Sequence, residues 1–179
     1  NREAGVRPVD FSSNLASLLH DDGTRCPVAY PIAPFRDPIH VLSTADPPLH
    51  TQHRRLLQSH LSPATVAGFE PVVSAIVEEL LAGVLSAGQV DLVATFSDPV
   101  PARAICEVIG LPSTDAPDVL RFTYGLGPLL DGVTLAEEMA SAMTSAIELA
   151  VLVQGRLDAA LQQPAEERPG LLAVLAEGI

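Results

Sequence analysis

Apolar side chains recur with the period of an α-helix along most of this chain. The clearest stripe lies between residues 64 and 87, where apolar residues return every three or four positions. The stripe consists of Val66, Phe69, Val73, Ile76, Val77, Leu80, Leu81 and Val84. This spacing puts them on one helix face, so we expect one amphipathic helix over residues 64–87 that ends at Gly88.

Start and stop signals place further helices on either side of this one. Asp46 followed by Pro47 and Pro48 is typical of a helix start, because an Asp side chain caps the first turn and a proline there has no N–H to lose. That helix is expected to run to about Leu61, after which Ser62-Pro63 restarts the chain. Further helices are expected over residues 98–110, 115–130 and 135–161 and after 169–170, with a turn at 131–132.

The first 45 residues have a different character. They are rich in Pro, Asp, Ser and Gly, which indicates loops, apart from a short helix-like patch over residues 11–19. A short extended piece is expected at residues 90–92. This strand content is too low for an alternating parallel-sheet fold, so the pattern predicts a mainly α-helical protein. Helical folds host unrelated activities, so function must be argued from a site.

Composition and charge exclude several classes of function. With 179 residues and 47% hydrophobic side chains, the chain can bury one substantial core, and we expect a single domain over 1–179. Its formal net charge of -12, with only ten Lys and Arg, argues against a nucleic-acid partner. No apolar run is long enough for a membrane span, and no secretory segment is visible. Two isolated cysteines fit a reducing cytoplasm.

The most informative charged residues are His50 and Arg54. They lie four positions apart, so a helix that starts near Pro47 places both on one face. A guanidinium fork and an imidazole N–H together suit a dianionic ligand. Two other interpretations remain: a solvated helix face, and, less favoured, a metal site that uses His50 and His53. The second lacks the additional ligands that a zinc site requires, so we predict no metal-ligating set here.

The residues give little support for a hydrolase or for a nucleotide-binding protein. Neither a Gly-x-Ser-x-Gly elbow nor a phosphate-binding glycine loop occurs. Cys106 lies within an expected helix, between Ile105 and Glu107, and is predicted to be a small core residue. Cys26 is predicted to be a loop cysteine. Gly125, Gly127 and Gly132 are either ordinary turn residues or sites that let a lid move.

Residues 45–63, ADPPLHTQHRRLLQSHLSP, resemble the start of helix C in bacterial cytochromes P-450, with the Asp-Pro-Pro-x-His-x-x-x-Arg pattern intact. Other segments resemble the same family in the same order: residues 11–13, 69–81, 90–93 and 98–112. The resemblance covers essentially the whole chain and weakens after Pro112. It implies a mainly α, partial cytochrome P-450 fold with helices B, C, D, E, F, G and H and very little strand. The 179 residues would then be one incomplete domain that lacks helix I and the Cys loop.

The family resemblance implies a cofactor and a substrate pocket. It implies haem b, with His50 and Arg54 holding its propionates and with the iron ligated by a Cys outside this chain. No catalytic residue would lie in these residues. The loop Ala29–Val41 and the segment Phe122–Thr134 would form the wall and the roof of the pocket. The apolar residues expected to line it are Phe35, Ile39, Val41, Leu126, Leu129 and Leu130, which predict a small apolar substrate.

The function implied is that of a soluble, cytoplasmic, bacterial haem monooxygenase, an oxidoreductase. Electrons would come from a ferredoxin-type donor that docks at the basic group formed by Arg54, Arg55 and the neighbouring histidines His50, His53 and His60. By itself the chain is expected to be inactive, because the catalytic Cys is not among its residues. The alternative is a truncated or degenerate relative that keeps the helical scaffold as a binding or interaction module without catalysis.

Overall fold

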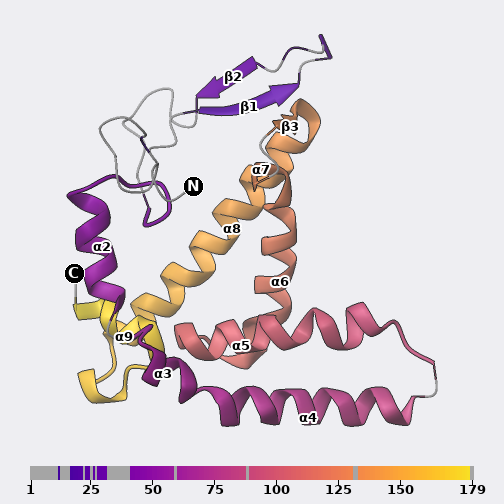
Figure 1. The fold of residues 1–179 in the computed structure, drawn as a ribbon, viewed down its shortest axis with the longest axis vertical. Helices are drawn as coiled ribbons and strands as arrows, with labels where there is room; N and C mark the ends of the chain where they lie inside the picture. Colours follow the sequence, from indigo (N-terminus) through magenta and orange to yellow (C-terminus); the bar gives the residue numbers. More distant parts are fainter. Residues whose placement is uncertain are drawn as a thin grey trace. The chain divides into compact units, whose positions relative to one another are not determined.

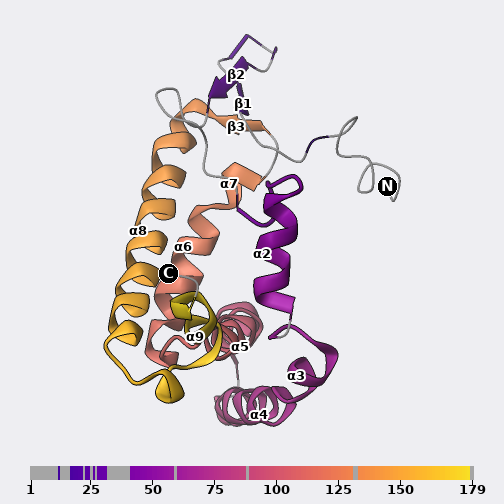
Figure 2. The same cartoon turned by 90° about the vertical axis from the view of Figure 1, so that its left-hand side faces the viewer.

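The computed structural model describes residues 12, 17–21, 23–24, 26, 28–31, 41–58, 60–87, 89–130 and 133–177. The chain divides into two compact units, one formed by residues 1–58 and 127–142 and the other by residues 59–126 and 143–179. Figures 1 and 2 show the chain in two views.

The first unit contains a small sheet that the sequence did not predict. Strand β1 (Ser17–Asp21) pairs antiparallel with β2 (Val28–Pro31) and parallel with β3 (Val133–Leu135), in the order β2-β1-β3. The Asp21 carboxylate accepts a hydrogen bond from the Gly23 N–H at 2.8 Å, and Gly23 has a φ of 89°, a turn conformation that favours glycine. The helix expected up to Leu19 is therefore wrong for residues 17–19.

Helix α2 (Leu49–Gln58) is the helix predicted after Asp46. The N–H of His50 donates to the Asp46 carbonyl at 3.0 Å, so Asp46 stands at the start of this helix. The intervening Pro47-Pro48 peptide bond is cis. The helix ends at Gln58, three residues earlier than expected. Helix α7 (Gly127–Leu130) and the first residues of helix α8 (Ala136–Leu161) also belong to this unit.

The second unit is helical throughout its described residues. Its elements are α3 (Pro63–Ala67), α4 (Glu70–Ser86), the π-helix η1 (Val93–Ser97), α5 (Pro99–Ile109), η2 (Ser113–Asp115), α6 (Ala116–Gly125), the larger part of α8, η3 (Ala165–Glu167) and α9 (Gly170–Glu177). Figures 1 and 2 show α4 and α5 lying side by side. Helix α5 also packs against α6 and α9, so it lies at the centre of this unit.

Two of the predicted helices are each divided by a proline. The helix expected over residues 64–87 is α3 followed by α4, because Pro71 has no N–H to donate to the Ala67 carbonyl. The helix expected over residues 115–130 is α6 followed by α7, because Pro128 likewise cannot donate to Tyr124.

A third local difference concerns the extended piece expected at residues 90–92. Leu92 is helical and leads into η1. The cause is Asp91, whose side chain accepts hydrogen bonds from the N–H groups of Val93 and Ala94 at 3.0 and 3.1 Å. The carboxylate therefore caps the start of a helix.

The core of the second unit forms where α5, α6, α8 and α9 meet. Cys106 and Leu172 are its most deeply buried large side chains, at 0% and 2% exposed. The other buried members are Ala102, Leu111, Ala116, Val119, Leu157, Ala160 and Ala176. Helix α5 ends as predicted at Gly110, whose φ of 93° is left-handed. The prediction of a mainly α fold with very little strand is confirmed. Among the described residues, no helix is long and apolar enough to cross a membrane.

Candidate functional site

His50 and Arg54 lie one turn apart on α2, as their spacing predicted. His50 is half-buried and Arg54 is exposed. Helix α2 also carries His53 and Arg55 and contains no acidic residue, so its ionisable side chains are two arginines and two histidines. Within the described part of the chain, neither the His50 nor the Arg54 side chain forms a hydrogen bond or an ion pair. Their donors are therefore free to bind a ligand from outside this segment.

The residues predicted to line a substrate pocket have mixed outcomes. Phe35 and Ile39 lie outside the described residues. Val41 is exposed beside a turn in the first unit, and the half-buried Leu129 and its neighbour Leu130 end helix α7. Leu126 is half-buried in the second unit, where its N–H donates to the carbonyls of Phe122 and Thr123 at 3.0 and 3.1 Å. Val41, Leu126 and Leu129 do not line the cavities described below, so the pocket remains a prediction.

The two cysteines have opposite environments. Cys26 is exposed, whereas Cys106 is fully buried in the core between α5 and its neighbours. Burial raises the pKa of the Cys106 thiol, and the nearby carboxylates of Asp115 and Glu107 add to the effect. Because the thiolate is the form that ligates metals, Cys106 is poorly suited to that role. Its predicted place in the core is confirmed.

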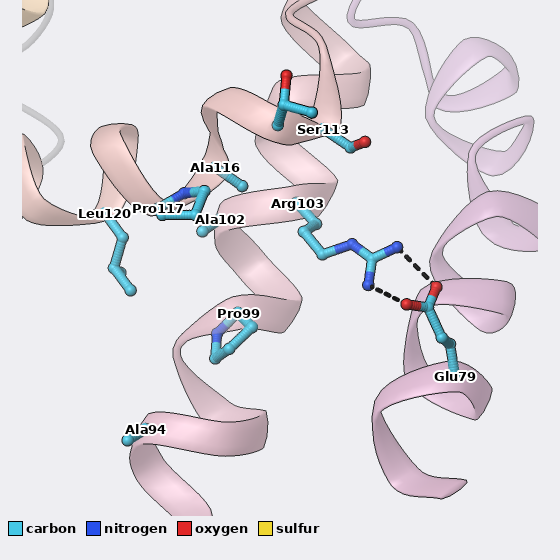
Figure 3. Close-up of a pocket in the computed structure, with 10 residues that line it drawn as sticks. Glu79, Ala94, Pro99, Ala102, Arg103, Ser113, Ala116, Pro117 and Leu120 are labelled. Carbon is cyan, nitrogen blue, oxygen red and sulfur yellow. Dashed lines mark hydrogen bonds and ion pairs between the residues drawn. The ribbon is translucent and has the colours of Figure 1, made fainter. Parts of the chain in front are cut away.

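A cavity of about 500 Å³ lies in the second unit and is lined by residues of α4, η1, α5, η2 and α6. Its walls are mostly apolar, and Figure 3 shows Ala102, Pro117 and Leu120 on one side. On the other side, Arg103 extends from α5 to Glu79 on α4 (Figure 3). The guanidinium donates two hydrogen bonds to the Glu79 carboxylate, at 3.1 and 2.8 Å.

The Glu79–Arg103 pair occupies the polar edge of this cavity. The hydrogen bond from Arg103 lowers the pKa of Glu79, and the same bond raises the pKa of Arg103. Both groups therefore stay charged near neutral pH and hold each other. Arg103 is then not free to bind an anionic ligand. We infer that the role of the pair is structural, to hold α4 and α5 together. No spacing in the sequence indicated it, because the partners are 24 residues apart.

A second pair joins η2 to α8. The Arg156 guanidinium donates to both carboxylate oxygens of Asp115, at 2.7 and 2.6 Å. Asp115 is 6% exposed, so its charge requires this partner. The hydrogen bonds that Arg156 donates to Asp115 raise the pKa of Arg156. The sequence analysis did not predict this pair, whose partners are 41 residues apart and which joins η2 to α8.

A third polar contact joins the N-cap residue of α5 to α6. The Tyr124 hydroxyl donates to Asp98 Oδ1 at 2.7 Å, and this hydrogen bond raises the pKa of the phenol. Asp98 was noticed in the sequence only as a helix start. Among the described residues, no group of three or more His, Cys, Asp or Glu side chains is arranged to hold a metal ion.

Relatives of this chain are found by sequence. It is similar to cytochrome P450 144 of Mycobacterium tuberculosis, with 30% identity over 173 residues that cover 96% of this chain and 39% of the relative. It is 34% identical over 128 residues to the mycinamicin IV hydroxylase/epoxidase of Micromonospora griseorubida, which covers 70% of this chain and 31% of that protein. No protein-family model matches the chain.

Solved structures agree with these relatives. The myxobacterial cytochrome P450 CYP267B1, crystallised in complex with myristic acid, superposes with a TM-score of 0.64 and 30% sequence identity, over 75% of this chain and 32% of that one. The chain thus spans about two fifths of the length of the first curated relative. Both kinds of likeness point to the same helical part of one fold, and the chain belongs to the cytochrome P450 family.

Proposed function

We propose that this chain forms the haem-propionate-binding part of a haem-dependent monooxygenase, with His50 and Arg54 as the propionate ligands. One observation carries the proposal: in a member of the cytochrome P450 family, a helix free of acidic residues presents a His and an Arg one turn apart, with no partner for either among the described residues. Haem b carries two carboxylates, which need donors of this kind.

The chemistry of these side chains fits a propionate. The Arg54 guanidinium offers paired N–H donors to a carboxylate, and the His50 ring adds one N–H from the preceding turn. The two side chains would hold and orient the cofactor and neutralise the negative charge of its propionates. When bound, a thiolate-ligated haem supplies the activation of dioxygen and the insertion of one oxygen atom into a substrate. The ligating Cys is proposed to lie outside this chain.

The proposed substrate is a small apolar molecule. One relative, the mycinamicin IV hydroxylase/epoxidase, is by its name an enzyme that oxidises an organic substrate. The apolar side chains proposed to contact the substrate are those of Phe35, Ile39, Val41, Leu126, Leu129 and Leu130. Apolar lining with few polar groups is typical of small-molecule sites.

The proposed electron donor is an acidic ferredoxin-type protein. Arg54, Arg55 and the histidines make α2 a basic helix on an otherwise acidic chain. Such a local field accelerates the encounter with a negatively charged partner. We place this exchange in the cytoplasm, where two unpaired cysteines stay reduced.

A reduced, carbon-monoxide difference spectrum on the full-length gene product tests the function. A thiolate-type Soret band is expected. Its absence would favour the alternative, a degenerate helical binding module without catalysis.

The Arg54→Ala variant of the same protein tests the assignment of the site. Loss of a charge-assisted hydrogen bond should make haem dissociate about tenfold faster, measured by transfer of haem to an excess of apomyoglobin. Arg55→Ala is the matched control, because Arg55 is an exposed arginine on the same helix that does not share the His50 face. Equal haem loss in Arg54→Ala and Arg55→Ala would refute the role of Arg54.

A further inference from the structure

A second cleft, of about 350 Å³, lies between α5 and α6 in the second unit. Its floor is apolar and includes Pro101 and Ile105 from α5 and Val119 from α6. Three polar side chains complete the lining: Asp98, Thr123 and Tyr124. A volume of this order, apolar walls and a few polar groups are the usual composition of a site for a small molecule.

Asp98 is the charged group of this cleft. It occupies the N-cap position of α5, where an Asp side chain would ordinarily accept a hydrogen bond from the helix, but it makes no such bond. Its Oδ1 instead accepts the Tyr124 hydroxyl at 2.7 Å. Within the described residues, Asp98 forms no ion pair, and its Oδ2 has no hydrogen-bond donor. Asp98 therefore contributes a carboxylate with one free oxygen to the lining of the cleft.

Tyr124 supplies the second recognition element. Its side chain is 63% exposed, and its hydroxyl is fixed by Asp98, so the aromatic ring lies beside the carboxylate at the edge of the cleft. The face of an aromatic ring attracts a cation. Carboxylate, ring and apolar floor together complement one class of molecule, an organic cation with an apolar body.

The other ligand classes fit less well. An anion would be repelled by Asp98 and by the formal net charge of -12 on the chain. A neutral apolar molecule would cover the carboxylate without compensating its lost hydration, which is unfavourable. A cation gains from both the local carboxylate and the overall charge.

We propose that the cleft between α5 and α6 binds a small organic ammonium ion, with Asp98 as the counter-ion and the Tyr124 ring as the cation-binding face. The site is distinct from His50 and Arg54, and it goes beyond the proposed monooxygenase function. It does not depend on haem.

The test uses phenyltrimethylammonium as the probe and the full-length protein labelled with ¹³C at isoleucine methyl groups. The nitrogen of this probe has no lone pair, so it cannot ligate an iron, and any response is independent of haem chemistry. A saturable shift of the Ile105 methyl signal is expected, because Ile105 lines the cleft. The Ile76 signal serves as an internal control, since Ile76 is buried in α4 and does not line the cleft.

Two variants identify the groups that bind the probe, and a third is the control. Asp98→Asn keeps the size of the side chain and an acceptor for Tyr124 but removes the charge, so the probe should bind about fivefold more weakly. Tyr124→Ala removes the ring and should weaken binding about threefold. Asp118→Asn, which removes an exposed acid of α6 that pairs with Arg121, should leave the affinity unchanged. Absence of a saturable Ile105 shift at millimolar probe, or equal affinity in Asp98→Asn and the wild type, would overturn the proposal.

Discussion

At the scale of single residues, burial decides what the two cysteines can do. Cys106 is 0% exposed, and its thiol pKa is raised because the protein interior disfavours the thiolate. Cys26 is exposed and has no such protection. Thiol reagents attack the thiolate, so Cys106 is protected both by its burial and by its raised pKa.

We therefore expect one reactive thiol in the folded chain and two in the unfolded chain. With a maleimide at neutral pH, mass spectrometry should find label on Cys26 within minutes and on Cys106 only after denaturant is added. The Cys26→Ser variant, which retains only the buried thiol, should stay unlabelled while folded. Rapid labelling of Cys106 in that variant would contradict its place in the core.

The raised pKa of the Cys106 thiol also determines how the free energy of unfolding changes with pH. A group with a raised pKa in the folded state contributes stability that is fully present below the pKa of the unfolded chain, about 8.5 for a thiol. That contribution is lost as the pH rises from there through the higher pKa of the folded state. The contribution of Cys106 to the free energy of unfolding should therefore decline only in alkaline solution, and Cys106→Ala should remove this decline.

At the scale of elements, two glycines allow the end of α5 to meet the start of α9. Gly110 has a φ of 93°, and a Cβ built there would lie 2.6 Å from the Pro169 carbonyl carbon. Gly170 has a φ of 52°, and its Cβ would lie 2.6 Å from the Gly110 backbone nitrogen. Backbone atoms cannot move away as a flexible side chain can. The close approach therefore requires glycine for both its conformation and its size.

Gly110→Ala should lower the free energy of unfolding by at least about 2 kcal/mol, because it combines an unfavourable positive φ with overpacking. Gly83→Ala is the matched control: Gly83 lies inside α4, and nothing lies within 4 Å of a Cβ built there. That substitution should raise the free energy of unfolding by about 0.5 to 1 kcal/mol. Both values are measured by urea denaturation followed by circular dichroism. Equal stability of Gly110→Ala and the wild type would show that the two backbones do not meet.

Element boundaries also show what the sequence could and could not predict. Helices α5 and α8 were predicted closely, because Asp98-Pro99 and Gly110 mark clear ends and α8 has a long apolar period. The breaks between α3 and α4 and between α6 and α7 were missed, although Pro71 and Pro128 signal them. The apolar stripe continues across each break, so periodicity alone joins the two helices. The β1–β2 pairing was missed because only Asp21 and Gly23 mark its turn.

At the scale of the whole molecule, local pairs were predictable and distant ones were not. His50 and Arg54 share a helix face through a spacing of four, which the sequence displays directly. Asp98 and Tyr124 meet over a separation of 26 residues, and Asp115 and Arg156 over 41. Such pairs depend on how α5, α6 and α8 pack, which periodicity does not specify. The sequence therefore predicted the proposed haem-binding residues but not the cleft between α5 and α6.

Overall charge and local charge have opposite signs in this protein, and this conflict yields a prediction for the proposed electron donor. The chain has a formal net charge of -12, yet its helix α2 carries Arg54, Arg55 and two histidines without any acid. An acidic ferredoxin is repelled by the net charge and attracted by the basic residues of α2. Salt screens both effects, so the sign of the salt dependence shows which one governs docking.

If docking is at α2, the rate of reduction of the full-length protein by an acidic ferredoxin should fall several-fold as ionic strength rises from about 0.02 M to 0.5 M, measured by stopped-flow. Arg55→Ala should lower the rate at low salt and flatten this dependence. Arg121→Ala removes one positive charge far along the sequence, from an exposed arginine already paired with Asp118 and Glu148. Arg121→Ala should therefore leave the dependence of the reduction rate on ionic strength unchanged. A rate that rises with salt would mean that net repulsion governs the encounter and that the basic residues of α2 do not form the docking site.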